Sequence, residues 1–213
     1  MNRHLALSLA LLTVAAAKTA DAQGMTAPKP TFGVLAGLNV ATAGGNDVQN
    51  AGSRTGLAIG GFATFHLANG FGIEPELLFS QKGASQSGGG ETETFKLDYI
   101  EIPVLARYDV ATRGPAHPYF LAGPALAFQV SCNLEATSDG ESQSASCDDL
   151  ADQFDLHKKT FDFGGQIGAG VAFPAGKKMN LSFSVRYTLG FTDVFDNVDA
   201  KNRNWSFLAG LTF

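Results

Sequence analysis

The chain has 213 residues, a net charge of -5 and only 16% charged residues. This length suits a single domain. The acidic balance and the lack of basic clusters argue against nucleic acid as a partner. No internal stretch is continuously hydrophobic enough to form a transmembrane helix. If the protein lies in a membrane, we therefore expect strands to cross it as a barrel.

The first residues have the layout of a secretory signal peptide. Arg3 and His4 precede an apolar core from Leu5 to Ala17, and Thr19–Ala22 ends in an A-x-A cleavage motif. The apolar run is shorter than the ~20 residues of a membrane span. We predict a signal peptide over 1–22, a periplasmic lead-in over 23–30 and one barrel domain over 31–213.

The two cysteines, Cys132 and Cys147, lie in one polar segment. In an exported protein such a pair predicts a disulfide, which closes a loop worth about 3 kcal/mol by the chain-entropy model. A metal site is the alternative. Two thiols with only His157 nearby do not complete a tetrahedral set at a recognised spacing, so we expect neither a metal nor a cofactor.

Eight segments alternate apolar and polar residues with the period of two that indicates β-strands. The clearest has Leu181 and Phe183 on one face and Ser182 and Ser184 on the other, whereas a helix would space its apolar residues three and four apart. Leu97, Tyr99 and Ile100 break the alternation of the fourth segment, which predicts a bulge. The predicted strands are Thr31–Val40, Thr55–Leu67, Phe71–Gly83, Phe95–Val110, Tyr119–Leu134, Thr160–Phe173, Met179–Asp193 and Trp205–Phe213.

The last segment ends on an aromatic residue at the end of the chain, as the last strand of an outer-membrane barrel does. Its outward face would carry the candidate assembly signal, Trp205, Phe207, Leu211 and Phe213. Ser206 and Leu208 would face inward, because side chains alternate across a strand.

The connections between the segments alternate in length. Residues 68–70, 111–118 and 174–178 are short, whereas 41–54, 84–94, 135–159 and 194–204 are longer and polar. Short periplasmic turns and long outer loops are typical of membrane barrels, and an even number of strands leaves no unpaired edge. We predict an all-β, eight-stranded, antiparallel up-and-down barrel in the bacterial outer membrane, with both termini in the periplasm and the cysteine loop outside.

A soluble barrel of the lipocalin type also has eight strands, but it keeps its apolar faces inside. Here the large apolar residues share a face without charges, and the opposite face carries the candidate lumen charges Glu74, Glu76, Glu101, Arg107, Asp162 and Arg186. Facing lipid, such charges would cost about 2–4 kcal/mol each at the midplane, whereas in a lumen they can pair. The pattern favours the membrane barrel.

The lumen charges have two interpretations. Their ion pairs could rearrange as a gate and open a narrow passage. The alternative is a fixed polar core, which we favour because eight strands leave an interior just wide enough for side chains.

Three segments resemble the signature strands of the PorT-like outer-membrane β-barrel family: Pro75–Gly83, Tyr99–Tyr108 and Tyr119–Pro124. They occur in the order of the family, and the resemblance runs from about Phe32 to Phe213. It implies an eight-stranded barrel of Bacteroidetes-like bacteria, mostly of unknown role. The namesake works in a protein-secretion pathway, but that role does not transfer to a general member.

Three functional hypotheses follow. We favour a structural or interaction platform that is held in outer-membrane lipid, is inserted by the outer-membrane assembly machinery and contacts a protein partner through its outer loops or periplasmic turns. The second hypothesis is a narrow gated pore for small solutes. The third is a hydrolase that uses His157 or a neighbouring serine of the outer loop, since His66 and His117 fall at the periplasmic turns. The chain lacks a recognisable set of base and orienting group, so we expect no catalytic residue and no enzyme.

Overall fold

In the computed structural model of this protein, the described residues are 29–46, 51–138, 140–147, 149, 159–195 and 198–213. The predicted signal peptide, most of the predicted lead-in and His157 lie outside these ranges. The described part contains one short 3-10 turn, η1 (Ala68–Gly70), and nine strands. The strands are β1 (Thr31–Gly44), β2 (Gly52–His66), β3 (Phe71–Gly88), β4 (Glu91–Asp109), β5 (His117–Ser138), β6 (Glu141–Ser146), β7 (Phe161–Pro174), β8 (Asn180–Phe195) and β9 (Val198–Thr212).

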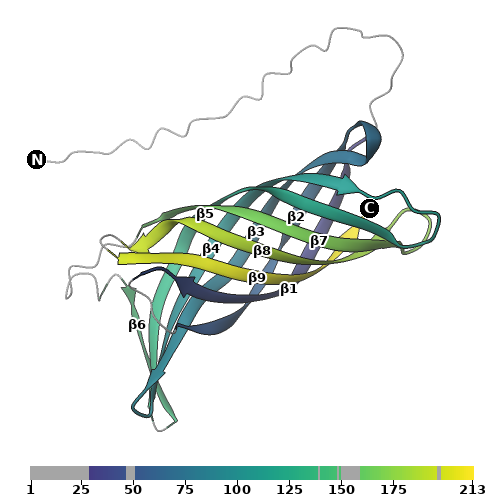
Figure 1. The fold of residues 1–213 in the computed structure, drawn as a ribbon. Coiled ribbons are helices and arrows are strands. Elements are labelled where there is room, and N and C mark those ends of the chain that lie inside the picture. The colour runs from purple at the N-terminus through teal and green to yellow at the C-terminus, as the bar shows by residue number, and fades with distance from the viewer. Residues whose placement is uncertain (1–28, 47–50, 139, 148, 150–158, 196–197) are drawn as a thin grey trace, which may run out of the picture.

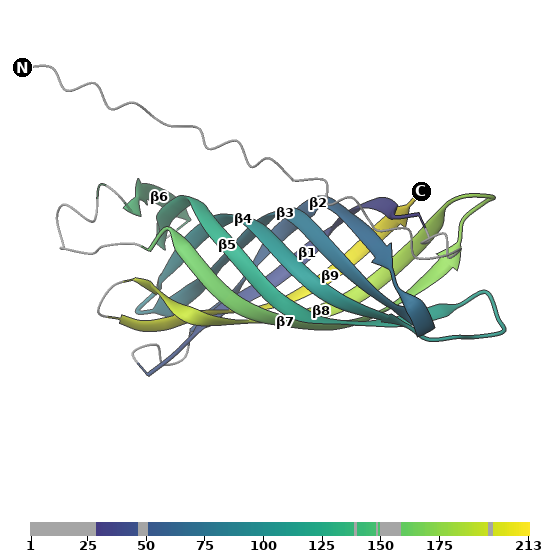
Figure 2. The same cartoon turned by 90° about the horizontal axis from the view of Figure 1, so that it is seen from above.

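Eight strands close into a ring, seen from two directions in Figures 1 and 2. Around the ring the order is β1, β2, β3, β4, β5, β7, β8 and β9, and all neighbours are antiparallel. The first and last strands pair from Gly33↔Thr212 to Gly44↔Lys201, which closes the barrel. The predicted eight-stranded antiparallel barrel is confirmed. Among the described residues, no helix has the length and apolar character needed to cross a membrane.

The two faces of the wall differ as the alternation predicts. On β8, Leu181 and Phe183 are exposed on the outer face, whereas Ser182 and Ser184 are buried in the interior. The apolar outer face continues around the barrel, and such a band suits contact with lipid. A lipocalin-type barrel needs the opposite arrangement, so this alternative is wrong.

The barrel has a turn end and a loop end. The turn end carries the connections β2–β3, β4–β5 and β7–β8, and there Phe213 N donates to Phe32 O at 2.9 Å. In the β2–β3 turn, Asn69 and Gly70 have φ values of 59° and 80°, a left-handed conformation that Asn and Gly adopt most easily. An exposed aromatic rim marks this end: Phe65, Phe71, Tyr108, Phe120 and Phe213.

At the opposite, loop end the strands run further than predicted. β3 and β4 leave only residues 89–90 of the predicted loop 84–94 outside strands, and β6 and the end of β5 lie within the predicted loop 135–159. Most of the described part of 194–204 belongs to β9. Hydrophobic alternation does not mark these extensions, because few of their residues are apolar.

The predicted bulge lies on the neighbouring strand. Tyr99 pairs with Gln129 and Asp98 pairs with Ser131, which leaves Val130 of β5 as the extra residue. The alternation of β4 is in fact regular, since Leu97 and Tyr99 both face the interior. These inward apolar side chains made the pattern look broken.

β6 is not part of the ring. Within the described residues, β6 pairs only with the outer part of β5. This part of β5 also pairs with β4, and β4 pairs in turn with β3. Residues 84–88, 91–98, 131–138 and 141–146 thus form a four-stranded sheet, called here the loop-end sheet. Figures 1 and 2 both show β6 beyond the barrel, at the end away from the carboxyl terminus.

Candidate functional site: the barrel interior and its two ends

One ion pair joins opposite walls at the centre of the barrel. Arg186 of β8 donates from Nη1 to the two carboxylate oxygens of Glu76 of β3, at 2.8 and 2.7 Å. Their side chains are 4% and 0% exposed. Gly168 of β7 leaves room for the arginine, because a Cβ there would lie 2.8 Å from Arg186 Cγ. Each buried charge depends on the other, since an unpaired one is costly.

A second ion pair lies nearer the turn end. Arg107 Nη1 donates to Glu74 Oε2 at 2.9 Å, and its Nη2 lies 2.9 Å from Asp109 Oδ1. Thr64 Oγ1 donates to the same Glu74 oxygen at 2.7 Å. The guanidinium also stacks 3.9 Å from the centre of the Tyr119 ring, a cation–π contact. Arg107 is therefore held from three sides.

A third ion pair lies nearer the loop end and includes a residue that the candidate set omitted. Glu101 pairs with Lys82 of β3, and both side chains are almost fully buried. The ammonium group also lies 5.5 Å from the centre of the Tyr99 ring. A signal for Lys82 was present in the sequence, since it follows Glu74 and Glu76 at even spacing on the same strand.

Asp162 stands apart from these pairs. Its carboxylate accepts hydrogen bonds from Thr192 Oγ1 at 2.6 Å and from Asn202 Nδ2 at 2.7 Å. Among the described residues these two groups hold it, without an ion pair to Lys or Arg. The six predicted residues thus all line the interior. Five of them belong to three ion pairs, one of which is completed by Lys82, and Asp162 is held by hydrogen bonds.

Neutral side chains fill the space between the charges. Asn39 Oδ1 accepts from Asn204 Nδ2 at 3.1 Å and from Ser206 Oγ at 2.8 Å, and Asn39 Nδ2 donates to Ser80 Oγ at 2.9 Å. A buried apolar cluster packs nearby and consists of Leu35, Ala58, Leu78 and Leu208. The interior is therefore packed along its middle section.

The predicted disulfide between Cys132 and Cys147 is present. It joins β5 to the residue that directly follows β6. Both sulfur-bearing side chains are buried in an apolar cluster at the loop end, together with Leu97, Tyr99, Ala127 and Val194. The bridge thus anchors β6 and also holds Cys147 in the loop-end mouth of the barrel.

The turn end keeps a polar cavity of about 250 Å³, lined in part by Arg107, Asp109, His66 and His117. Thr31 Oγ1 lies 3.2 Å from His66 Nε2, and Thr112 Oγ1 lies 3.4 Å from His117 Nδ1. Among the described residues, no group of three His, Cys, Asp or Glu side chains could hold a metal ion. His157, the histidine of the hydrolase hypothesis, lies outside the described residues.

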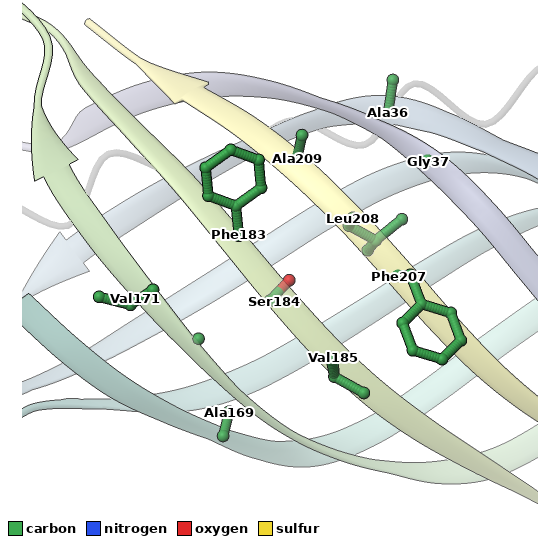
Figure 3. Close-up of a pocket in the computed structure, with 11 residues that line it drawn as sticks. Ala36, Gly37, Ala169, Val171, Phe183, Ser184, Val185, Phe207, Leu208 and Ala209 are labelled. Carbon is green, nitrogen blue, oxygen red and sulfur yellow. The ribbon is translucent and has the colours of Figure 1, made fainter.

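An apolar groove of about 690 Å³ lies on the outer wall over β7, β8, β9 and β1. Figure 3 shows Phe183, Val185 and Phe207 among the side chains that line it, together with the smaller Ala169 and Ala209. Most of the lining side chains belong to the apolar outer face, so bilayer hydrocarbon can fill this groove. It is a feature of the membrane-facing surface.

The ring of antiparallel strands with an apolar outside and a charged inside is the architecture of outer-membrane barrels. A family model described as "Outer membrane protein beta-barrel domain" matches residues 22–196. The chain belongs to this family. The protein is accordingly a small β-barrel of the bacterial outer membrane. No curated protein matches the chain.

Solved outer-membrane barrels share the fold of this family member. Neisserial surface protein A (NspA) is 18% identical, with a TM-score of 0.50 over 87% of this chain and 98% of that protein. OprG from Pseudomonas aeruginosa is 12% identical, with a TM-score of 0.50 over 86% and 95%. A major outer membrane protein from Thermus thermophilus is 13% identical, with a TM-score of 0.50 over 87% and 100%. These likenesses show the fold alone.

The barrel places the candidate assembly signal on the lipid-facing side of β9. Trp205, Phe207 and Phe213 are exposed there, and Leu211 is half-buried. Their role in assembly stays a prediction.

At the loop end of the barrel, Lys201 links the β8–β9 region to β1. Its Nζ lies 2.9 Å from Asp193 Oδ1 and also pairs with Asp199, whose Oδ2 accepts from Asn46 N at 3.1 Å and Asn46 Nδ2 at 2.7 Å. The hydrogen bond from Lys201, followed by that from the Asn46 backbone, lowers the pKa of Asp199. Hydrogen bonds to Asp199 and Asp193 raise the pKa of Lys201.

Proposed function

We propose that this outer-membrane barrel is a non-conducting anchor that presents the loop-end sheet to a macromolecule outside the cell. The observation that carries the proposal is the Arg186–Glu76 pair, which crosses the lumen at its centre with both side chains buried. A solute path would require this pair to part. Separating two buried charges without new partners costs about 3–5 kcal/mol.

The two ends of the barrel support the orientation. The turn end has short connections, and the loop end has strands that extend beyond the ring into a polar sheet. Short periplasmic turns and long extracellular segments are the usual asymmetry of outer-membrane barrels. The outer half of this sheet, residues 85–88, 91–94, 135–138 and 141–144, is mostly polar, which suits water outside the membrane rather than lipid.

The proposal includes a PorT-like ancestry, supported by the resemblance of Pro75–Gly83 and Tyr99–Tyr108 to strands of those proteins. It does not include their secretion role. It also includes the absence of catalysis. Each described histidine of the barrel lies next to a threonine hydroxyl, and among the described residues neither of these histidines forms a hydrogen bond with a carboxylate that could orient it.

A gated pore is the second candidate, favoured by the polar cavity of about 250 Å³ at the turn end. In that case Arg107 and Arg186 would exchange partners as the lumen opens. The conductance measurement that closes the Discussion separates this candidate from the closed anchor.

The orientation can be tested by inserting a short epitope between Gly89 and Gly90, in the turn that joins β3 to β4. Both glycines lie in open space, with no heavy atom within 4 Å of an added Cβ, so the insertion should be tolerated. We expect antibody to bind this epitope on intact cells. The matched control is the same epitope at Gly114, in the β4–β5 turn, which should be reached only after the outer membrane is opened. The reverse pattern would contradict the proposed presentation of the loop-end sheet.

A further inference from the structure

Within the described part of the chain, β6 is an edge strand of the loop-end sheet, and its unpaired side is called here the free edge. β6 pairs with β5 from Asn133↔Ser146 to Ser138↔Glu141, and within the described residues no strand pairs with its other side. Natural sheets usually shield such an edge with charged side chains, lysine above all, with proline or with a bulge. The strand reads Glu-Ser-Gln-Ser-Ala-Ser and has neither lysine nor proline, and its single charged residue, Glu141, stands at its first position. Its register with β5 is regular, and its first four residues are exposed.

We propose that the free edge of β6 is a docking site for an extended, basic segment of another polypeptide, which adds a strand to the loop-end sheet. This deepens the proposed function and rests on it, because the platform then has a defined contact surface and a partner of defined chemistry. In strand addition, backbone hydrogen bonds supply the affinity and neighbouring side chains supply the specificity.

The register assigns the backbone groups that a partner would use. Ser138 pairs with Glu141 across a two-residue connection, and antiparallel pairs alternate between hydrogen-bonded and non-hydrogen-bonded positions. If Ser138 and Glu141 form a hydrogen-bonded pair, the next pair, Thr137–Ser142, is of the non-hydrogen-bonded type, in which the side chains lie closer together. Their hydroxyl oxygens lie 2.9 Å apart, which agrees with that assignment. The N–H and C=O groups of Ser142 and Ser144 therefore point away from β5, towards the free edge.

The edge is held in place before any partner arrives. The Cys132–Cys147 disulfide fixes one end of β6 to β5, and six consecutive residue pairs hold the rest. On the next two strands of the sheet, Ser87 and Thr92 are joined by a hydroxyl contact of 3.0 Å. A rigid edge loses little conformational freedom on binding, which favours association.

Acidic side chains at both ends of β6 specify the charge of the incoming strand. Glu141 begins the strand and is exposed, with Glu91 two strands away in the same register row. At the other end, Ser146 Oγ donates to the exposed Asp149 at 2.7 Å. A basic segment would meet an acid at either end. A second copy of this chain, paired antiparallel, would instead bring the Glu141 end of one β6 towards the Asp149 end of the other, and like charges repel.

The test uses the folded barrel in detergent micelles and a labelled, end-capped peptide of sequence Lys-Thr-Val-Thr-Val-Thr-Lys. Binding is followed by fluorescence anisotropy. A second peptide of the same sequence carries N-methyl groups on alternate residues, so its charge is unchanged but one backbone edge cannot donate. We expect the N-methylated peptide to bind at least about tenfold more weakly, because backbone hydrogen bonds are lost and their partners stay unpaired.

Two variants locate the site on this chain. Ser144→Pro removes an outward N–H while sparing the ladder to β5, since proline is tolerated where an edge N–H faces solvent, and it should weaken binding of the plain peptide by a similar factor. Ser144→Ala keeps the backbone donor and should bind as the unaltered protein does. Each variant is verified as folded by two observations: the unheated protein migrates differently on a gel from the heated protein, and the disulfide is intact.

Each outcome decides the proposal. Equal binding of the two peptides would mean attraction by charge alone and would overturn strand addition, as would no binding to verified folded barrel. Self-association of the barrel that Ser144→Pro abolishes would assign the edge to a second copy and overturn the basic partner. The peptide experiments do not test whether the lumen conducts or whether an epitope at Gly89 lies outside the cell. The proposed function and the strand addition can therefore fail independently of each other.

Discussion

Arg186 and Glu76 lie 110 residues apart in the chain, yet the arginine donates two hydrogen bonds to the glutamate across the barrel interior. β8 and β3 are separated around the ring by β9, β1 and β2, so the pair braces two walls that are not neighbours in the sheet. The two side chains meet inside the lumen, and both are buried there.

Removal of one member of this pair should be worse than removal of both. Arg186→Met leaves the Glu76 carboxylate buried without a cation, and we expect a loss of about 3–5 kcal/mol in the free energy of unfolding. The double variant Arg186→Met/Glu76→Met should recover most of this loss. Urea unfolding in micelles, followed by the unheated gel shift, measures both. A double variant as unstable as the single one would argue against the pairing.

A charged substitution on the outer face should destabilise the barrel, whereas loss of a hydroxyl group on the inner face should be tolerated. Phe183 is half exposed on the outer wall, and Ser184, beside it in sequence, is buried in the interior. Phe183→Arg should cost about 2–4 kcal/mol if it lies near the midplane and should reduce the folded protein in the outer membrane. Ser184→Ala is the control and should assemble normally. The two faces would be wrongly assigned if the serine variant alone failed.

Loss of the disulfide should loosen β6 and leave the ring intact. The bridge spans a sequence separation of 15 residues, and a loop of this size is worth about 3 kcal/mol in the chain-entropy model. For Cys132→Ser/Cys147→Ser we expect faster amide exchange in residues 141–146 and an unchanged heat-dependent gel shift. Unchanged exchange in β6 would show that the bridge is not what holds the strand.

The link between β1 and β9 should persist in mild acid. Since the folded state lowers the pKa of Asp199 from its ordinary value of 3.8, the link stabilises the protein above that value and is lost as the pH falls through the lower, folded pKa. Carboxyl carbon shifts in an NMR titration should give a midpoint below 3.8, and Lys201→Met should move that midpoint upwards. A midpoint at or above 3.8 in the unaltered protein would contradict the contacts of Asp199 with Lys201 and Asn46.

The alternation of side chains made most of the barrel predictable. Phe183 outward and Ser184 inward follow from the period of two, because one face of each strand must meet lipid. The inward charges Glu74, Glu76 and Arg186 followed from the same rule. Lys82 obeys it too, but a lysine near the predicted end of its strand could equally have belonged to a loop.

The remainder depends on relationships that alternation does not encode. The partner of Arg186 is set by the closure and stagger of the whole ring, which bring β8 opposite β3. β6 was missed because both of its faces meet water, so Ser142, Gln143 and Ser144 show no apolar period. The Val130 bulge was placed on β4, because Leu97 and Tyr99 pack inside with the disulfide instead of facing lipid.

Conductance across a planar bilayer tests the closed lumen most directly. The protein is refolded, its fold is verified by the unheated gel shift, and single insertions are recorded for the unaltered chain and for Arg186→Met/Glu76→Met. We predict a silent bilayer for the unaltered protein, because the Arg186–Glu76 pair and the packed side chains around it occupy the lumen. Discrete openings of the unaltered protein, with an amplitude that changes in the double variant, would contradict the closed anchor and establish the gated pore.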